Sequence, residues 1–464
     1  MINTSFFELF KIGPGPSSSH TVGPMRAAFE FRQTITNYLQ NCSSDKHISL
    51  RIALYGALAA TGHGHGTHRA LLAGLLGYLP TNVPITALNN FFTATDESYC
   101  LLLGEQKITF VESDIYFDYG HNPYRHPNTM KFVLLQDYVP VLEQVFYSVG
   151  GGFIETDKHE AATLMITKGT PTYIYSNMAD LQQLQQESGV SVDVILLANE
   201  MAISLMTEQE VFARIADILE IMEQSVVNGL QKEGILPGGL QVHRRAKSMY
   251  EKAQHLTEQG RWGDALFARL NAYALATSEE NAAGQMVVTA PTNGAAGVIP
   301  ATIAYLVNDC HVGRETISRG LLVAAMVGFI IKDNASISGA ELGCQAEVGS
   351  AAAMAAALFS FCYGEPLDVI ASAAEIAMEH HLGMTCDPIK GLVQIPCIER
   401  NATGAVKAYN AYLLASGRTT QPLISFDQVV EVMRQTGLDL SAKYKETALG
   451  GLATSFGWGN MPGS

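Results

Sequence analysis

Three cysteines set in polar, irregular segments beside Ala-rich apolar runs constrain this chain more than any other feature. Cys344 lies in NASISGAELGCQAEVG, and Cys386 and Cys397 lie in MTCDPIKGLVQIPCIERN, where Pro and Gly interrupt helical continuity. Thiolates brought together from loops at helix ends can hold three irons of a 4Fe–4S cube and leave the fourth iron open. An open iron is a Lewis acid for a hydroxyl or carboxylate of a small ligand. The three segments therefore predict a cluster site among helices.

The spacing of these cysteines also allows a second interpretation, in which they are ordinary buried thiols. The spacing matches no compact CxxC pattern of a ferredoxin or a zinc site. Two features favour the cluster. CDP and PC fix the backbone beside Cys386 and Cys397, and the flanking residues form no amphipathic stripe.

Composition narrows the classes of protein to which the chain can belong. Its 464 residues suffice for two or three domains, and its net charge of −15 argues against binding to nucleic acid or a membrane surface. Seven unevenly spaced cysteines form no secreted disulfide framework, and the first residues lack a signal-peptide pattern. The longest apolar runs, 320–331 and 348–361, are shorter than the ~20 residues that span a bilayer. We expect a cytoplasmic protein.

The segment GPGPSSSHTVGPM predicts an anion-binding helix N-terminus. Gly and Pro exclude helix at its start, and a helix can follow over residues 21–33. Unpaired backbone N–H groups and the helix dipole favour a negative group at such a terminus. A plain cap is the alternative, but a cap needs only one hydroxyl. The segment offers more polar groups than that: Ser17, Ser18, Ser19, His20 and Thr21. We therefore favour a carboxylate site.

Three histidines occupy the Gly-rich turn YGALAATGHGHGTH. One glycine separates His63 from His65, and His68 follows. A metal site needs further ligands, and no Asp, Glu or Cys lies close in sequence. A solvated turn and a catalytic role are equal alternatives, because an imidazole with a pKa of about 6.5 is the natural general base at neutral pH.

Hydrophobic patterning divides the chain into two regions. Residues 48–54, 107–117, 130–135 and 142–148 have the alternation or the β-branched and aromatic content of strands. Three glycines at 150–152 predict a hinge, after which the composition turns helical. The pattern therefore predicts an α+β N-terminal third followed by a helical region.

Two polar islands interrupt the apolar helices of the second region. Thr292 and Asn293 form the first, and Asn334, Ser336 and Ser338 form the second. Such islands are often satisfied helix caps. Two of them in a helical region that also carries the thiol segments favour the rim of one pocket.

Six long strings of the chain match the pattern of one enzyme family. They are GPSSSHTVGPM (15–25), YGALAATGHGHGT (55–67), YSVGGGFI (147–154), ENAAGQMVVTAPTNGAAGVIPA (280–301), NASISGAELGCQAEVG (334–349) and MEHHLGMTCDPIKGLVQIPCIERN (378–401). With these strings the chain resembles the bacterial iron–sulfur L-serine dehydratases in their single-chain form. The resemblance extends from the N-terminus to about Ala453.

The resemblance implies both an architecture and a set of site residues. It implies an α+β N-terminal domain over 1–155, like the allosteric substrate-binding domain of some phosphoglycerate dehydrogenases, and an all-α catalytic domain over 156–464. It further implies a homodimer. The cluster ligands would be Cys344, Cys386 and Cys397, and the catalytic base would be His65. The cysteines that match no ligand position are expected to be structural: Cys42, Cys100, Cys310 and Cys362.

The reaction implied is the conversion of L-serine to pyruvate and ammonia, with the hydroxyl eliminated at the open iron. Ser17–Thr21 and Asn293 would donate hydrogen bonds to the substrate carboxylate, whose charge they would stabilise. His65 would remove the Cα proton.

The chain departs from the family pattern at two positions. Members usually carry a cysteine shortly after GGLA that coordinates the fourth iron, whereas GGLATSFGWGNMPGS has Trp458 near that position and no cysteine. A common acidic residue after GHGT is replaced by His68, which leaves the partner that orients His65 undefined.

Three alternatives from other classes stay open. A pyridoxal-phosphate dehydratase would use a lysine Schiff base, but no lysine lies beside a convincing phosphate-binding loop. A non-catalytic amino-acid sensor would bind serine without releasing pyruvate. A hydro-lyase of the same cluster type would act on a hydroxy acid without an amine.

Overall fold

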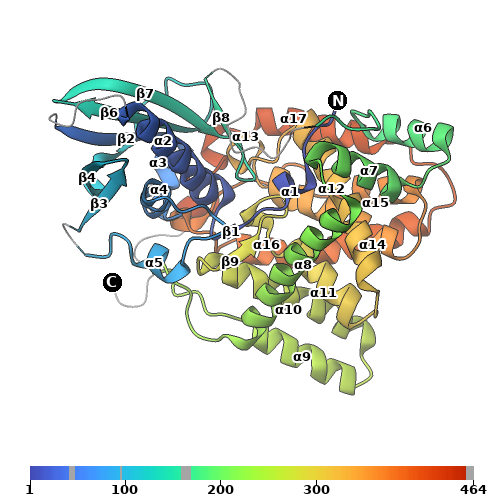
Figure 1. Cartoon of the computed structure of the whole chain (residues 1–464). Coiled ribbons are helices and arrows are strands. Elements are labelled where there is room, and N and C mark those ends of the chain that lie inside the picture. Colours follow the sequence, from blue (N-terminus) through green and yellow to red (C-terminus); the bar gives the residue numbers. More distant parts are fainter. Residues whose placement is uncertain (41–46, 95–96, 158–168, 456–464) are drawn as a thin grey trace.

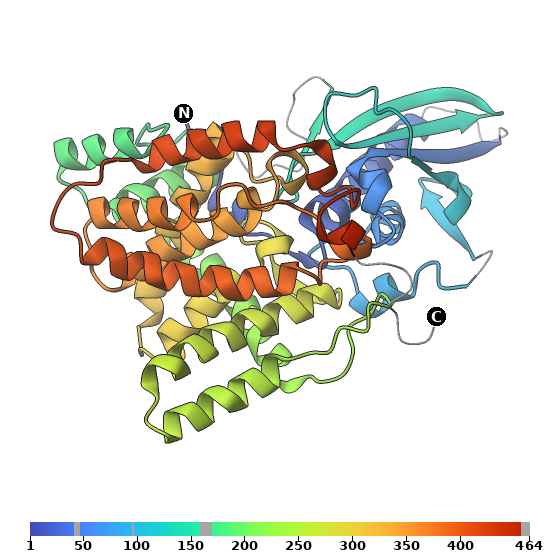
Figure 2. The same ribbon diagram turned by 180° about the vertical axis from the view of Figure 1, so that it is seen from behind.

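The computed structural model describes residues 1–40, 47–94, 97–157 and 169–455. Figure 1 shows a sheet-containing region at one end of the molecule and a larger helical region at the other. The view from behind shows the C-terminal helices packed side by side across the helical region (Figure 2). An α+β N-terminal region followed by a mostly helical one is thereby confirmed.

The N-terminal region is built on a five-stranded mixed sheet of order β5-β2-β6-β7-β8. Only β2 and β5 run parallel, and the other neighbours are antiparallel. The strands are β2 (Ile48–Gly56), β5 (Ile115–Asp118), β6 (Asn128–Gln136), β7 (Val139–Ser148) and β8 (Ile154–Thr156). A separate hairpin pairs β3 (Ser98–Leu103) with β4 (Gln106–Val111). The continuous strand predicted over 107–117 is wrong, because the 3₁₀ turn η2 (Glu112–Asp114) separates β4 from β5.

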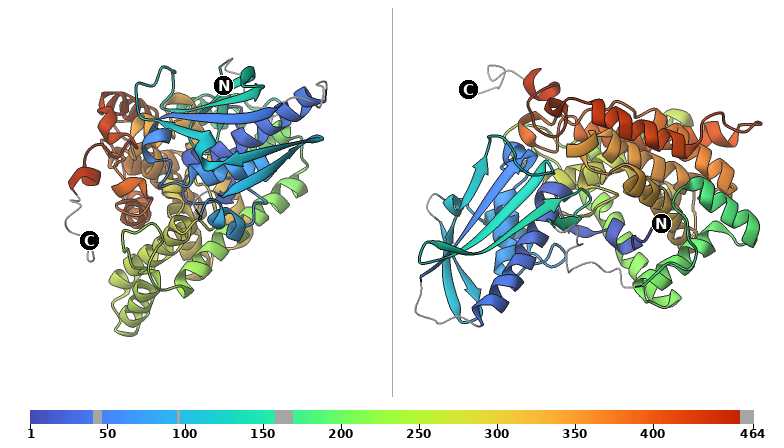
Figure 3. Two further views of the ribbon diagram at one scale, coloured as in Figure 1. Left: turned by 90° about the vertical axis from the view of Figure 1, so that its left-hand side faces the viewer. Right: turned by 90° about the horizontal axis from the view of Figure 1, so that it is seen from above.

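Two helices, α2 (Gly23–Leu39) and α4 (Thr67–Leu76), cover one face of this sheet (Figure 3). The rings of Phe31, Phe132 and Phe146 form the centre of the core between α2 and the sheet, with neighbouring centroids 5.0 and 5.5 Å apart. A Cβ on Gly74 would lie 2.2 Å from the carbonyl oxygen of Met25, so glycine lets α2 and α4 pack closely. Shorter helices α3 (Ala57–Thr61) and α5 (Ile85–Asn90) complete the region.

The helical region has a large core of apolar side chains. Its longer helices are α6 (Met178–Ser188), α7 (Val192–Ser204), α8 (Glu208–Gln231), α9 (Ala246–Glu258), α10 (Trp262–Ala282), α11 (Val298–Asn308), α12 (Arg314–Asn334), α14 (Ser350–Cys362), α15 (Leu367–Glu379), α16 (Cys397–Ser416) and α17 (Phe426–Asp439). Short helices are α13 (Gly339–Leu342) and α18 (Leu452–Ser455). One helical stretch, Gln345–Cys362, is long and apolar enough to cross a bilayer, but 83% of it is buried inside the protein, as in a core helix.

The two regions are joined by the first residues of the chain. Strand β1 (Ile12–Pro14) pairs antiparallel with β9 (Met286–Val288) of the helical region. Helix α1 (Phe6–Leu9) is capped by Ser5, whose Oγ donates a hydrogen bond of 2.7 Å to the buried carboxyl of Glu200. The segment after β1 is therefore fixed against the helical region before it enters the N-terminal sheet. Gly150, Gly151 and Gly152, predicted as a hinge, all have positive φ values.

The buried imidazole of His381 predicts a pH dependence of stability. Burial lowers the pKa of His381 to about 4, and its Nδ1 lies 2.6 Å from the carbonyl oxygen of Ala377. An unfolded chain binds a proton here near pH 6.5, so the folded state loses stability as the pH falls from about 6.5 to about 4. Urea unfolding should show that His381→Gln loses about 2 kcal/mol less stability than the wild type between pH 8 and pH 5. His380→Gln changes the neighbouring exposed histidine and should keep the wild-type slope; equal slopes in all three proteins would contradict the prediction.

Candidate active site

The three predicted cluster cysteines come from separate segments and are all buried. Cys344 precedes the π-helical turn η4 (Gln345–Gly349), Cys386 lies in the loop after α15, and Cys397 begins α16. Their exposed fractions are 3%, 5% and 9%. The Pro- and Gly-broken sequence around Cys386 keeps its segment out of helix, which lets it turn inward between helices.

Each thiol lies in the electrostatic field of the others. Burial raises the pKa of Cys344 to about 11 and raises the pKa of Cys386 and of Cys397 well above the usual value, and the neighbouring sulfurs add to the last two shifts. The three sulfurs do not all lie within 4.8 Å of one another. A single tetrahedral ion holds ligand sulfurs only about 3.8 Å apart, whereas thiolates on different irons of a cube lie farther apart. As it stands, the arrangement is too open for a single tetrahedral ion.

Arg400 on α16 supplies a positive charge beside the thiols. Burial alone lowers its pKa, but Cys344, Cys397 and Asp387 raise it above the ordinary value. Its guanidinium donates to the carbonyl oxygen of Thr385 and lies 3.2 Å from the Asp387 carboxylate. Buried neutral thiols become thiolates when a metal binds them, and a fixed guanidinium stabilises that negative charge. The donor set and its surroundings fit a 4Fe–4S cluster.

His65 is 1% exposed and is oriented by the backbone. Its Nδ1 lies 2.9 Å from the carbonyl oxygen of Thr61, which can only accept, so Nδ1 carries the proton and Nε2 keeps its lone pair. Burial, and then the neighbouring His20, hold the pKa of His65 well below the usual value. The imidazole is therefore neutral at pH 7, as a general base must be. The carbonyl of Thr61 is the orienting partner that the sequence left undefined.

His65 and His20 converge on one carboxyl group. Glu446 Oε1 lies 3.9 Å from His65 Nε2 and 3.3 Å from His20 Nδ1, and the two imidazole centroids are 4.4 Å apart. Burial lowers the pKa of His20 to about 4 and raises the pKa of Glu446 to about 8. The Glu446 carboxyl group is therefore largely protonated and the His20 imidazole neutral at pH 7, and such strongly shifted pKa values are typical of functional sites.

Glu446 belongs to the site through a pairing between distant segments. The backbone N–H of Glu446 donates a hydrogen bond of 2.7 Å to the carbonyl oxygen of Cys386. The N–H of Cys386 in turn donates a hydrogen bond of 2.7 Å to the carbonyl oxygen of Tyr444. Glu347 also contacts this thiol, with Oε2 3.8 Å from Cys386 Sγ, and burial raises the pKa of Glu347 to about 8. The sequence analysis identified neither Glu446 nor Glu347. Glu347 could have been found, because it is an acidic residue three positions after the proposed ligand Cys344.

The predicted anion segment is buried and largely engaged in its own hydrogen bonds. Ser17 caps the π-helical turn η1 (Ser18–Val22) by accepting from the N–H of His20, which is the capping role weighed above. Ser19 Oγ lies 2.8 Å from His20 Nδ1, and Thr21 Oγ1 donates 2.8 Å to the carbonyl oxygen of His65. The segment therefore positions the two histidines.

Asn293 lies beside this segment in the interior. Its Nδ2 donates 2.9 Å to Asn281 Oδ1, and its backbone N–H lies 3.5 Å from Ser18 Oγ. Its Oδ1 is buried without a hydrogen-bond partner. Thr292, the other residue of the first polar island, is also buried. Ser336, from the second polar island, donates a hydrogen bond to the carboxylate of Glu341. The two islands approach each other at Gly151, where an added Cβ would lie 3.1 Å from the carbonyl oxygen of Pro291 and 2.8 Å from Cδ1 of Ile337. The rim of one pocket stays a prediction.

A cavity of about 580 Å³ opens onto this histidine loop. Its lining includes Thr21, His63, His65 and Arg69 from the N-terminal region and Ala282 and Lys390 from the helical region. Arg69 Nε is buried without a hydrogen-bond partner. The cavity offers a small anionic molecule a route to His65.

The remaining sequence predictions concern the other four cysteines, Trp458 and His68. Cys100 is exposed, and Cys310 and Cys362 are half-buried. Cys42 and Trp458 lie outside the described residues. His68 does not orient His65; its Nε2 lies 3.9 Å from Glu112 Oε1.

Comparison with known proteins assigns the chain to a family. The serine dehydratase beta chain model matches residues 5–159, and the serine dehydratase alpha chain model matches residues 187–453. The L-serine dehydratase of Haemophilus influenzae is 43% identical and L-serine dehydratase 2 of Escherichia coli is 42% identical, each over 97% of this chain and 98% of the relative. The L-serine dehydratase of Streptomyces coelicolor is 43% identical over the same shares. The chain belongs to the single-chain bacterial L-serine dehydratase family.

Proposed function

We propose that this protein converts L-serine to pyruvate and ammonia and that Cys344, Cys386 and Cys397 hold a 4Fe–4S cluster for that reaction. The observation that carries the proposal is the convergence of three buried thiols beside the pair of His65 and Glu446. The names of the full-length relatives support the substrate.

The cluster supplies Lewis-acid chemistry for departure of the hydroxyl. The chain contributes the surroundings of the reacting atoms. Arg400 balances the charge of the thiolates, and burial of the whole group excludes water from the elimination. Aminoacrylate released by the elimination tautomerises and hydrolyses to pyruvate and ammonia.

His65 Nε2 takes the Cα proton. Its Nδ1 proton is held by the carbonyl oxygen of Thr61, so the tautomer is fixed before substrate arrives. Burial raises the pKa of Glu446 to about 8 and lowers that of His20 to about 4, so both groups are largely uncharged at neutral pH and leave His65 as the group that takes the proton.

Substrate recognition rests on buried polar groups near this pair. Ser17, Ser18, Ser19, His20 and Thr21 bring hydroxyls and a helix N-terminus to the carboxylate, and Arg69 adds a guanidinium from the cavity wall. Asn293 is expected from the sequence to donate to the carboxylate, but its Nδ2 already donates to Asn281 Oδ1. Its unpaired Oδ1 is an acceptor and suits the ammonium group instead, which a hydroxy acid lacks. This acceptor favours serine over the hydroxy-acid alternative.

We extend the proposal to the organisation of the protein. The sequence division at residues 155 and 156 would separate a substrate-binding-like domain from the catalytic domain, and the enzyme would act as a homodimer in the cytoplasm. L-Serine is its small-molecule partner, and we propose neither a nucleic-acid nor a membrane partner.

Anaerobic reconstitution with iron and sulfide, followed by a pyruvate assay on L-serine, tests the function. We expect broad absorbance at about 400 nm and activity that air destroys. Pyruvate formation by the iron-free protein would overturn the role of the cluster, and an aldimine band at about 410–420 nm would point to pyridoxal phosphate. Serine binding without pyruvate release by the cluster-loaded protein would indicate the sensor.

A further inference from the structure

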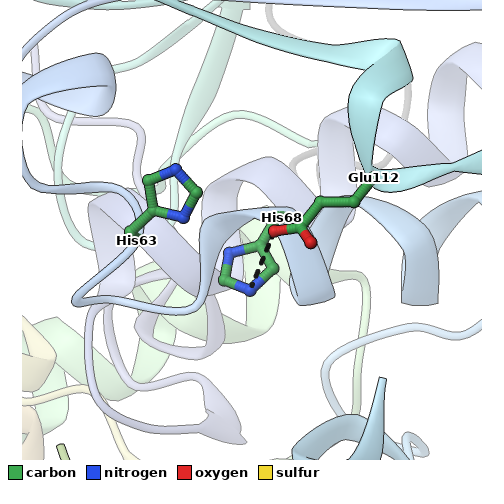
Figure 4. Close-up of side chains that lie close together, drawn as sticks. All are labelled: His63, His68 and Glu112. Carbon is green, nitrogen blue, oxygen red and sulfur yellow. Dashed lines mark ion pairs between the residues drawn. The ribbon is translucent and has the colours of Figure 1, made fainter. Parts of the chain in front are cut away.

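A second set of metal-ligating side chains lies outside the thiol site. His63 and His68 flank the Gly-rich loop before α4, and Glu112 begins η2 between two strands. One ligand atom from each residue lies within 4.8 Å of the other two, and among the described residues this is the one such group of three. Figure 4 shows the two rings side by side, with the Glu112 side chain reaching toward His68.

His68 has a ring nitrogen that the fold leaves unsatisfied. The residue is 6% exposed, and its Nδ1 is buried without a hydrogen-bond partner. Its Nε2 lies 3.9 Å from Glu112 Oε1, which is too long for a hydrogen bond. By contrast, both ring nitrogens of His20 have partners within hydrogen-bond distance. Buried polar atoms are normally paired, so the ring of His68, with Nδ1 unpaired and Nε2 facing Glu112, can take a ligand that the protein itself does not supply.

His63 is exposed but its ring is held in place. It stacks on Phe117 with a centroid distance of 3.9 Å and an interplanar angle of 17°, and its centroid lies 5.3 Å from that of His68. Desolvation lowers the pKa of His63 and lowers that of His68 to about 3. Both imidazoles are therefore neutral at pH 7 and have a lone pair for a metal.

We propose that His63, His68 and Glu112 bind a divalent transition-metal ion of the zinc type, with water completing its coordination. Two imidazoles and one carboxylate are a common ligand set for Zn²⁺. Such an ion has bonds of about 2.0–2.1 Å and ligand atoms about 3.4 Å apart, so the side chains must close slightly. Glu112, whose side chain is 46% exposed, is free to rotate toward the rings. Hard cations are disfavoured, because imidazole is a poor ligand for them.

The ion would hold the loop that carries His65 in a fixed position. His63 and His65 both line the 580 Å³ cavity, and the ion would tie His63 to Glu112 in the N-terminal region. The site is separate from the thiols and goes beyond the proposed function.

The test is Zn²⁺ binding to the anaerobic, iron–sulfur-loaded full chain in zinc-buffered solution, measured by metal analysis and zinc X-ray absorption. We expect one zinc per chain in addition to the iron, with nitrogen and oxygen ligands. His68→Asn and Glu112→Gln should each weaken binding at least tenfold. Glu112→Gln changes a half-exposed side chain and keeps the test valid where His68→Asn fails to fold.

His255→Asn is the matched control, because His255 and Glu258 form an exposed pair 3.5 Å apart. That variant should bind zinc as the wild type does. The proposal is overturned when the wild type binds no zinc beyond its iron, when Glu112→Gln binds equally tightly, or when the absorption spectrum shows sulfur ligands. These outcomes are read from binding, so they do not depend on whether serine is the substrate.

Discussion

A Cys386→Ser variant is expected to lose the 4Fe–4S cluster and about a thousandfold or more of its activity on L-serine. Lewis-acid catalysis by a metal contributes several kcal/mol to the transition state, and about 4 kcal/mol corresponds to three orders of magnitude. Cys386 is the sharpest choice among the three cysteines, since its backbone N–H and carbonyl both bond to the 444–446 segment. The serine backbone can keep those bonds, so the change removes the sulfur alone.

Iron and sulfide analysis, absorbance at about 400 nm and the pyruvate assay measure the effect. Cys362→Ser is the matched control, because Cys362 is a half-buried cysteine in α14 with no role in the site. Circular dichroism separates loss of the cluster from loss of the fold. A Cys386→Ser protein that retains full iron content and activity would exclude Cys386 as a ligand.

A His65→Asn variant is expected to keep its cluster and to lose between about 10² and 10⁴ in kcat, the range for removal of a general base. The described contacts of His65 are with Thr61, Thr21, His20 and Glu446, and none is with a thiol, so the iron content should not change. Because the carboxylate contacts are proposed to come from the 17–21 segment and Arg69, kcat should fall much more than KM changes.

Turnover and cluster absorbance are measured on the same sample, with His121→Asn, an exposed histidine of the N-terminal region, as the control. A Glu446→Gln variant gives the decisive comparison. If His65→Asn remains active while Glu446→Gln does not, the carboxyl group and not the imidazole is the base.

Much of the fold followed from local pattern. The capping box of Thr207 and Glu210 begins α8, as the spacing of polar and apolar residues requires. The predicted strands around residues 48–54, 130–135 and 142–148 lie in β2, β6 and β7. The break at η2 was not predicted, because the turn that contains Glu112 and Asp114 is short and the residues on both sides of it have β-rich composition. The pairing of β1 with β9 depends on contacts between residues far apart in sequence, which no local pattern encodes.

The sequence by itself determined the family and singled out the three thiols and His65 as candidates, because each sits in a local string whose residue types carry the chemistry. Only the tertiary structure decided which groups face them. Glu446 reaches His65 because the 444–446 segment pairs with Cys386, and Glu112 reaches His68 because the turn between β4 and β5 lies over the start of α4. The shifted pKa values of His65 and Glu446 follow chiefly from burial, which depends on the packing of the whole chain.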